Sequence, residues 1–308
     1  MKLHAVTRLI GALLVWASAH TNTAAMDSKG NWNASLFDYD SNTEFKTEIV
    51  YEKTVDGVVV ADLQFDALLN KDGTLTKAYL VKPQGNNARH PGILWTHWLG
   101  ETETTSRVQY LDEAITLAKA GFVSLLVDAM WAEPDWYTQR KLDEDFTNSV
   151  RQVIALRRSL DLLRAQAEVN SDRIAYVGHD YGAMYGILAI AADAKVDTAV
   201  LIAATSSFED WAFYASKSDS LEAYQTENAP LNLMEALVAT KDTSLFFQFA
   251  EVDQYVPLQK AYTLFEAANA PKRIQVYKNA SHEMNEPDEI RADRIHWLVT
   301  RLEHGKAD

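Results

Sequence analysis

The chain contains Ile174-Ala175-Tyr176-Val177-Gly178-His179-Asp180-Tyr181-Gly182-Ala183-Met184-Tyr185-Gly186, and this stretch decides the fold. Its hydrophobic run, its glycine-flanked turn and its run of small residues predict a strand, a sharp turn at Asp180 and a helix. A residue held in a strained turn of this kind needs neighbours with almost no side chain, so that strand and helix can approach each other. Gly178 and Gly182 meet this requirement. An aspartate before a helix is also an ordinary N-cap, so the assignment of Asp180 as a functional residue depends on the rest of the chain.

Strand-like and helix-like runs alternate on both sides of this stretch. Strands are predicted at residues 58–65, 75–81, 92–97, 122–127, 174–177, 196–202, 244–250 and 274–277. Helices are predicted at residues 106–119, 145–165, 181–192, 257–268 and 288–303. This alternation is typical of a mostly parallel sheet with helices on both faces. No repeat or linker divides residues 26–308, so we expect one domain, with a short lid of two or three small helices at about 206–242.

The first 25 residues have the order of a secretory signal peptide. Lys2 and Arg8 form a basic start, residues 9–19 are mostly apolar, and Thr23-Ala24-Ala25 offers small residues for cleavage. The apolar run is too short to span a bilayer. We therefore expect a protein that starts near Met26, is periplasmic or secreted, and does not insert into a membrane. The polar residues 26–46 predict a loosely held leader.

The charge and the lack of cysteine limit the possible partners and chemistry. Residues 26–308 carry 27 basic and 43 acidic side chains, a net charge of −16 with histidine neutral. Such a charge argues against nucleic acid or an anionic membrane as a partner, and leaves a small-molecule substrate as the expected one. The chain has no cysteine, which excludes disulfides and a thiol nucleophile. The oligomeric state is not indicated by the sequence.

Two further candidate residues follow Asp180 along the chain. Asp253 lies in Glu251-Val252-Asp253-Gln254-Tyr255-Val256-Pro257, after a predicted strand, and His282 follows the last predicted strand. All three residues therefore fall at the carboxyl ends of strands, the edge at which open α/β sheets build their sites. Their order along the chain, nucleophile, acid and histidine, is that of a hydrolase catalytic triad.

Over residues 58–305 the chain resembles the α/β-hydrolase superfamily, and within it the dienelactone-hydrolase-like branch. The resemblance rests on the glycine-flanked turn, on the Asp253 segment and on the Ser281-His282 loop. It implies an α/β-hydrolase fold and a cofactor-independent hydrolase with Asp180, Asp253 and His282 as catalytic residues. It also implies an oxyanion hole made by the backbone N–H of Tyr181 and one from the His97–Leu99 segment. Trp98 stands where relatives usually have glycine, so its side chain must point away from the site, with Leu99 beside it.

Asp180 stands where most relatives carry serine or cysteine, and this part of the sequence resembles epoxide hydrolases and haloalkane dehalogenases. Carboxylate attack on an ester would give an unstable mixed anhydride, whereas attack on an sp³ carbon bearing a halide or a strained oxygen gives an alkyl-enzyme ester. An epoxide, a haloalkane or a related small molecule is therefore the expected substrate. Two alternatives remain open: an esterase or lactonase with Asp180 as general base, and a non-catalytic binding protein on a hydrolase scaffold.

Aromatic residues in the loops at the same sheet edge are candidates for a substrate pocket. These candidates are His97, Trp131, Trp136 and Tyr137. The sequence has no closely spaced histidine pair and no dinucleotide or phosphate-binding motif, so no metal and no cofactor are expected.

Overall fold

A computed structural model describes residues 32–85, 88–100, 104–193, 195–214, 220–269 and 271–303. Contacts divide the chain into Met1–Asn31, which lies outside the described residues, and Trp32–Asp308, which contains the sheet. The predicted signal peptide, residues 1–25, therefore falls outside the described part of the chain. Within the described part, no helix has the length and apolar character needed to cross a membrane.

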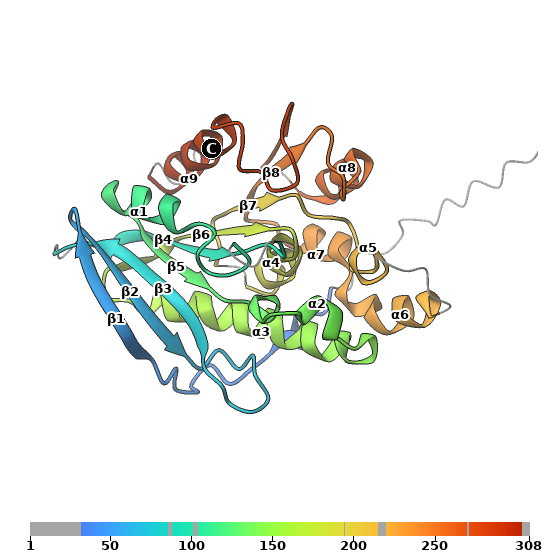
Figure 1. Cartoon of the computed structure of the whole chain (residues 1–308), viewed down its shortest axis with the longest axis horizontal. Helices are drawn as coiled ribbons and strands as arrows, with labels where there is room; N and C mark the ends of the chain where they lie inside the picture. The colour runs from blue at the N-terminus through green and yellow to red at the C-terminus, as the bar shows by residue number, and fades with distance from the viewer. Residues whose placement is uncertain are drawn as a thin grey trace, which may run out of the picture. The chain divides into compact units, whose positions relative to one another are not determined.

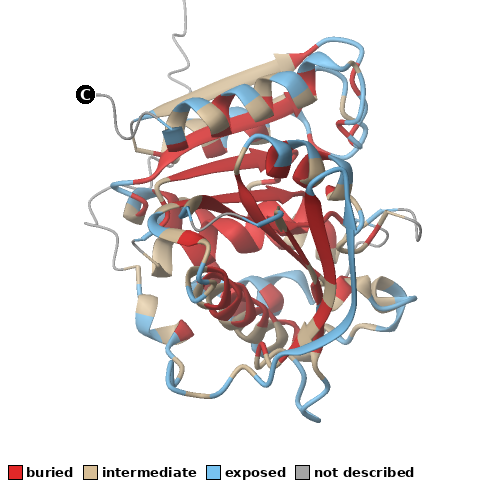
Figure 2. Cartoon of the chain, turned by 90° about the vertical axis from the view of Figure 1, so that its left-hand side faces the viewer, coloured by how far each residue is buried: buried red, intermediate tan, exposed pale blue. Residues whose placement is uncertain are grey.

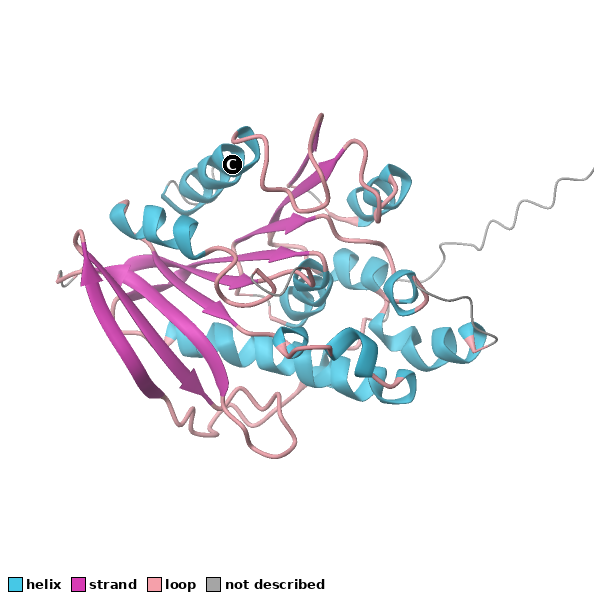
Figure 3. Ribbon diagram, in the orientation of Figure 1, coloured by secondary structure: helices cyan, strands magenta, loops and turns pink. Residues whose placement is uncertain are grey.

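The second unit is built on a nine-stranded sheet with the order β1-β2-β3-β5-β4-β6-β7-β8-β9 (Figures 1 and 3). The strands are β1 Glu48–Val55, β2 Val58–Phe65, β3 Thr76–Pro83, β4 His90–Thr96, β5 Val123–Val127, β6 Val169–His179, β7 Thr198–Ile202, β8 Ser244–Ala250 and β9 Lys272–Tyr277. The pairs β1–β2, β2–β3 and β3–β5 are antiparallel. The pairs β5–β4, β4–β6, β6–β7, β7–β8 and β8–β9 are parallel. The predicted α/β-hydrolase architecture, with a mostly parallel sheet, is confirmed.

Helices cover both faces of the sheet. They are α1 Leu111–Lys119, α2 Trp136–Gln139, α3 Asp145–Arg164, α4 Tyr181–Ala192, α5 Glu209–Ala212, α6 Leu221–Asn228, α7 Leu233–Ala239, α8 Leu258–Ala267 and α9 Glu289–Glu303. Short 3₁₀ turns are η1 Ala34–Phe37, η2 Met130–Ala132, η3 Leu142–Glu144 and η4 Ala229–Leu231. The lid segment predicted at 206–242 holds α5, α6, η4 and α7.

Alternate side chains of each strand enter one of two hydrophobic clusters, as the two-residue period of a strand requires. Along β4, Leu94 packs with the α3 and α4 side, whereas Ile93 and Trp95 pack with the α1 and α9 side. The parallel strands are accordingly buried along most of their length (Figure 2). Both faces of the central sheet are thus largely closed to water.

Two features at the amino-terminal side differ from the sequence prediction. Strand β1 was not predicted, because all its residues are exposed and it therefore shows no buried face in the sequence pattern. The leader predicted to be loosely held is packed against the unit from Trp32 onward. Phe37 is fully buried, and the guanidinium of Arg158 donates to the carbonyls of Thr43 and Glu44.

Candidate active site

The turn between β6 and α4 holds Asp180 at its tip. Its backbone has φ 54° and ψ −117°, an uncommon and strained conformation for a residue with a side chain. A Cβ on Gly178 would lie 2.4 Å from the carbonyl oxygen of Gly182, and one on Gly182 would lie 2.5 Å from that of Thr96. Both contacts are too short for any side chain, so the two glycines permit the close approach that holds Asp180 in its turn at the sheet edge.

The two oxygens of the Asp180 carboxylate have different surroundings. Oδ2 accepts a hydrogen bond from the backbone N–H of Leu99 at 3.3 Å, and the N–H of Tyr181 also stabilises the charge. Oδ1 is buried and has no hydrogen-bond partner among the residues that the structure describes. Burial raises the pKa of Asp180 to about 7, against the opposing effects of His282 and of the two N–H groups.

His282 is held by Asp253 through one ring nitrogen. Its Nδ1 lies 2.8 Å from Asp253 Oδ2, while Asp253 Oδ1 accepts from the N–H groups of Tyr255 and Val256. The other nitrogen, Nε2, is buried without a partner in the described part of the chain. Burial lowers the pKa of His282, but the hydrogen bond to Asp253 and the charges of Asp180 and Asp253 outweigh this effect and raise it. The ring is therefore oriented, with a nitrogen left open for a proton.

The loop after β4 presents the backbone N–H of Leu99, and not that of Trp98, to Asp180. The N–H of Trp98 is taken by Gln109 Oε1 at 2.9 Å, and its indole stacks on His179 with ring centroids 5.2 Å apart. A Cβ on Gly100 would lie 2.2 Å from the Trp98 indole, so this position accepts no side chain. The geometry leaves the amides of Leu99 and Tyr181 as the pair that faces the Asp180 carboxylate.

Of the four residues predicted to line a pocket, two lie beneath this loop. His97 is buried, with Nδ1 2.8 Å from the Trp98 carbonyl and Nε2 accepting from the N–H of Ala129. Burial lowers the pKa of His97 to about 4, which agrees with a neutral ring in this role. The indole N–H of Trp131, also fully buried, donates to the same Trp98 carbonyl at 3.1 Å. Both side chains shape the loop and have no polar atom left for a substrate.

The other two predicted pocket residues, Trp136 and Tyr137, are half-buried. Trp136 packs edge-on against the ring of Tyr181, with centroids 5.7 Å apart, and Tyr137 donates its hydroxyl to the carbonyl of Trp211. They connect the nucleophile turn with the lid helix α5. Their placement is compatible with the predicted pocket wall.

Sequence reasoning missed an aromatic cluster that covers His282. The rings of Tyr255 and Trp211 lie 5.0 and 5.6 Å from the His282 ring. Trp211 is 9% exposed, and its indole Nε1 is buried with no partner among the described residues. Tyr255 follows Asp253 by two positions and could have been suspected from the sequence. Trp211 could not, because only the folded lid brings it to the site.

Two cavities in the described part of the chain lie beside this site and not in it. One of about 520 Å³ is bordered by the loop 69–77, η2 and α3, and another of about 370 Å³ lies within the lid. Neither is lined by Asp180 or His282, whose side chains are almost completely buried. The site is therefore identified by the arrangement of its side chains and backbone N–H groups, and not by the size of a cavity. No group of three potential metal-ligating side chains is found among the described residues.

The glycine-flanked turn, the oriented histidine and the sheet define an α/β-hydrolase. The model of the dienelactone hydrolase family matches residues 76–297, and the chain belongs to that family. It is therefore a hydrolase, as the sequence predicted. No curated protein matches the chain by sequence.

Solved structures show the same fold at low sequence identity. The acetyl xylan esterase from Paenibacillus sp. R4 aligns with a TM-score of 0.70 and 17% identity, over 87% of this chain and 92% of that one. Acetyl xylan esterase 1 from Thermoanaerobacterium sp. JW/SL YS485 aligns with a TM-score of 0.68 and 17% identity, over 88% and 92%. A 2,6-dihydroxy-pseudo-oxynicotine hydrolase aligns with a TM-score of 0.61 and 18% identity, over 84% and 69%.

Proposed function

We propose that the protein hydrolyses a small organic molecule through an alkyl ester formed on Asp180. The electrophile is an sp³ carbon that carries a halide or a strained oxygen. The observation that carries this proposal is the asymmetry of the carboxylate: Oδ2 is held by the Leu99 N–H, whereas Oδ1 has no partner among the described residues. A carboxylate oriented in this way has one oxygen fixed and the other free to attack.

In the first step Asp180 Oδ1 forms a bond to the carbon, and the leaving group departs with the electron pair of the broken bond. The indole N–H of Trp211 is a buried donor close to His282 that lacks a partner in the described part of the chain. An unpaired buried donor costs about 1–3 kcal/mol. Donation to a developing halide or oxygen anion would satisfy it and would lower the barrier to departure.

In the second step His282 Nε2 removes a proton from water, and the hydroxide attacks the carbonyl carbon of the ester. Asp253 orients the ring and stabilises the imidazolium that forms. The negative charge develops on Oδ2, the oxygen that already accepts from the N–H of Leu99, with the N–H of Tyr181 also stabilising the charge on the carboxyl group. Collapse of this intermediate releases the alcohol, which takes the proton from His282. The carboxyl group left on Asp180 then loses the second proton of the water, to solvent after a haloalkane or to the alkoxide formed from an epoxide, and becomes a carboxylate again.

A second function rests on the raised pKa of Asp180. A carboxyl with a pKa of about 7 is well suited to act as a general base near neutral pH. In that role it would direct water to an ester or lactone with no covalent intermediate. The carboxylate geometry favours the covalent route, because Oδ1 has no partner among the described residues and Asp253 already orients the histidine that would complete the cycle.

The test is to trap the intermediate with His282→Gln. The variant is incubated with haloalkanes, epoxides and short esters, and the peptide that contains Asp180 is examined by mass spectrometry. We expect a stoichiometric adduct from a haloalkane or an epoxide, because glutamine cannot accept the proton that hydrolysis requires. The double variant D180N/H282Q is the matched control and should show none. Ester turnover by the wild type, without an adduct in H282Q, would favour the general-base function.

A further inference from the structure

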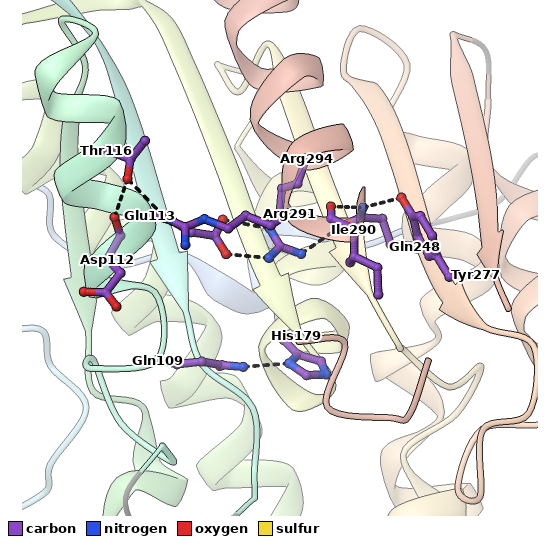
Figure 4. Close-up of polar contacts among 10 residues, drawn as sticks. All are labelled: Gln109, Asp112, Glu113, Thr116, His179, Gln248, Tyr277, Ile290, Arg291 and Arg294. Atoms are coloured by element: carbon purple, nitrogen blue, oxygen red, sulfur yellow. Dashed lines mark hydrogen bonds and ion pairs between the residues drawn. The ribbon is translucent and has the colours of Figure 1, made fainter. Parts of the chain in front are cut away.

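Three hydrogen bonds, one buried and two part-buried, connect the loops that carry the proposed catalytic groups. The N–H of Trp98 donates to Gln109 Oε1 at 2.9 Å. The amide Nε2 of Gln109 lies 2.8 Å from Nδ1 of His179, and Nε2 of His179 lies 2.9 Å from the carbonyl oxygen of His282. Figure 4 shows the central bond, which joins the segment before α1 to the end of β6. We call this chain of bonds the Gln109–His179 relay.

The direction of each bond follows from the chemistry of its two atoms. The Trp98 N–H can only donate, so it requires the oxygen of Gln109, and the amide nitrogen of Gln109 then faces His179. That nitrogen donates, so Nδ1 of His179 must accept, and the proton of the neutral ring sits on Nε2. From there it donates to the His282 carbonyl, which can only accept. Burial, together with the charge of His282, lowers the pKa of His179 well below its ordinary range, in agreement with a neutral ring.

We propose that Gln109 and His179 are positioning residues. They fix the backbone of His282 and the loop of Leu99 in their positions relative to Asp180. This inference rests on the proposed function. The three groups belong to loops after β4, β6 and β9. Leu99 and Asp180 are 81 residues apart along the chain, and His179 and His282 are 103 residues apart. His179 precedes Asp180 directly, so its bond to His282 links the nucleophile and the base through one backbone step.

The stacking of His179 on Trp98 strengthens this link. The two ring planes are only 7° apart, so the imidazole is fixed by a flat contact as well as by its two hydrogen bonds. Displacement of a catalytic group by about 1 Å can cost about 100-fold in rate. The relay would therefore act on the second step most strongly, since hydrolysis of the ester depends on the placement of His282.

The experiment uses Gln109→Met and His179→Phe, with Gln248→Met as the matched control. Gln248 is a buried glutamine that, like Gln109, uses both the oxygen and the nitrogen of its amide in hydrogen bonds, to Tyr277, Ile290 and Arg294, on the α9 side (Figure 4). Phenylalanine retains a ring that can stack on Trp98 but has no polar atom. We expect hydrolysis of the Asp180 ester to slow at least about 10-fold more than its formation in Q109M and H179F. Q248M should leave the ratio of the two rates unchanged.

A second readout needs no substrate and separates the relay from the proposed function. The imidazole of His282 is titrated by NMR in the wild type and in each variant. A loosened backbone weakens its bond to Asp253, so its pKa should fall in Q109M and H179F and stay constant in Q248M. If this pattern of pKa shifts is found but no variant forms an Asp180 ester, the proposed covalent function is wrong and the positioning role of Gln109 and His179 still holds. An unchanged His282 titration in a folded Q109M protein, or the same shift in Q248M, would overturn the relay.

Discussion

Two buried polar clusters of similar size lie on the same sheet and differ in how their hydrogen bonds are satisfied. At the proposed site, Asp180 Oδ1, His282 Nε2 and Trp211 Nε1 are buried without partners among the described residues. In the second cluster, which we call the Arg294 network, Arg294 donates to both oxygens of Glu113 at 2.5 and 3.0 Å and to Gln248 at 3.0 Å (Figure 4).

The difference separates a stabilising cluster from a reactive one. The Arg294 network joins α1, β8 and α9, and its charges are compensated by the bidentate contact between Arg294 and Glu113. Each unpartnered atom of the site lowers the stability of the folded protein, because it lost its hydrogen bonds to water and forms none in their place. A buried polar atom without a partner therefore needs an explanation, and the proposed function supplies one for these three atoms. The predictions that follow test this contrast, from the largest expected change to the smallest.

Removal of the charge of Arg294 should have the largest effect on stability. In Arg294→Met, Glu113 is left buried and unpaired, and breaking a buried ion pair in this way costs about 3–5 kcal/mol. Unfolding in urea measures the loss. The rate of hydrolysis per folded molecule should stay near that of the wild type, because the network does not touch Asp180.

The double variant E113Q/R294M is the control for this prediction. It removes both charges, so it should recover part of the free energy of unfolding lost in the single variant. Equal stability of the single variant and the wild type would show that the Arg294 network does not hold the helices. A loss of activity in a fully folded R294M protein would remove the distinction between the two clusters.

Substitution of Asp180 should stabilise the protein at high pH. The pKa of Asp180 is about 7 when folded and near 3.8 when unfolded, so its contribution is present at low pH and is lost as pH rises through 7. Asp180→Asn has no carboxyl group to ionise at this position, so its free energy of unfolding does not fall for this reason as pH rises. Its advantage in the free energy of unfolding over the wild type should therefore grow by about 2 kcal/mol between pH 5.5 and 8. A constant difference across this range would mean that burial does not raise the pKa of Asp180.

Removal of the unpartnered indole N–H should have the smallest effect. Trp211→Phe should slow ester formation from a haloalkane about 10-fold, equivalent to about 1.4 kcal/mol, and leave ester hydrolysis nearly unchanged. Stopped-flow single turnover measures the two steps. Trp297→Phe is the matched control, because its indole N–H is already bonded to Thr198 at 2.8 Å on the α9 side. Equal effects of both substitutions on ester formation would exclude Trp211 as a donor to the leaving group.

The sequence predicts the parts of this fold that depend on local sterics and periodicity. Gly178 and Gly182 mark the nucleophile turn because any side chain there would collide with backbone, and the hydrophobic runs mark the buried strands. Strand β1 escapes prediction because an edge strand with no buried face has no period to detect. The sequence also does not show how deeply a residue after a strand is buried. His97 and Trp131 were therefore expected to line a pocket, although both are buried under a loop.

Contacts between distant loops are also beyond sequence reasoning. The choice of Leu99 over Trp98 as the amide that faces Asp180 depends on Gln109, which binds the N–H of Trp98. Nothing in the local sequence of Gln109 or Trp211 indicates a role at the site, because each reaches it only through the tertiary fold. The candidate catalytic residues can thus be named from the sequence, but the residues that contact them in the fold cannot.

The most direct test of the account is a single turnover in water labelled with oxygen-18, with enzyme in excess over a haloalkane or epoxide substrate. If Asp180 forms an alkyl ester, the labelled water attacks the carbonyl of Asp180, and the oxygen that leaves with the product comes from the enzyme. The account therefore predicts an unlabelled oxygen at the attacked carbon of the first product and one heavy oxygen in the Asp180 peptide. Label at that carbon after the first turnover, with an unlabelled Asp180 peptide, would contradict it.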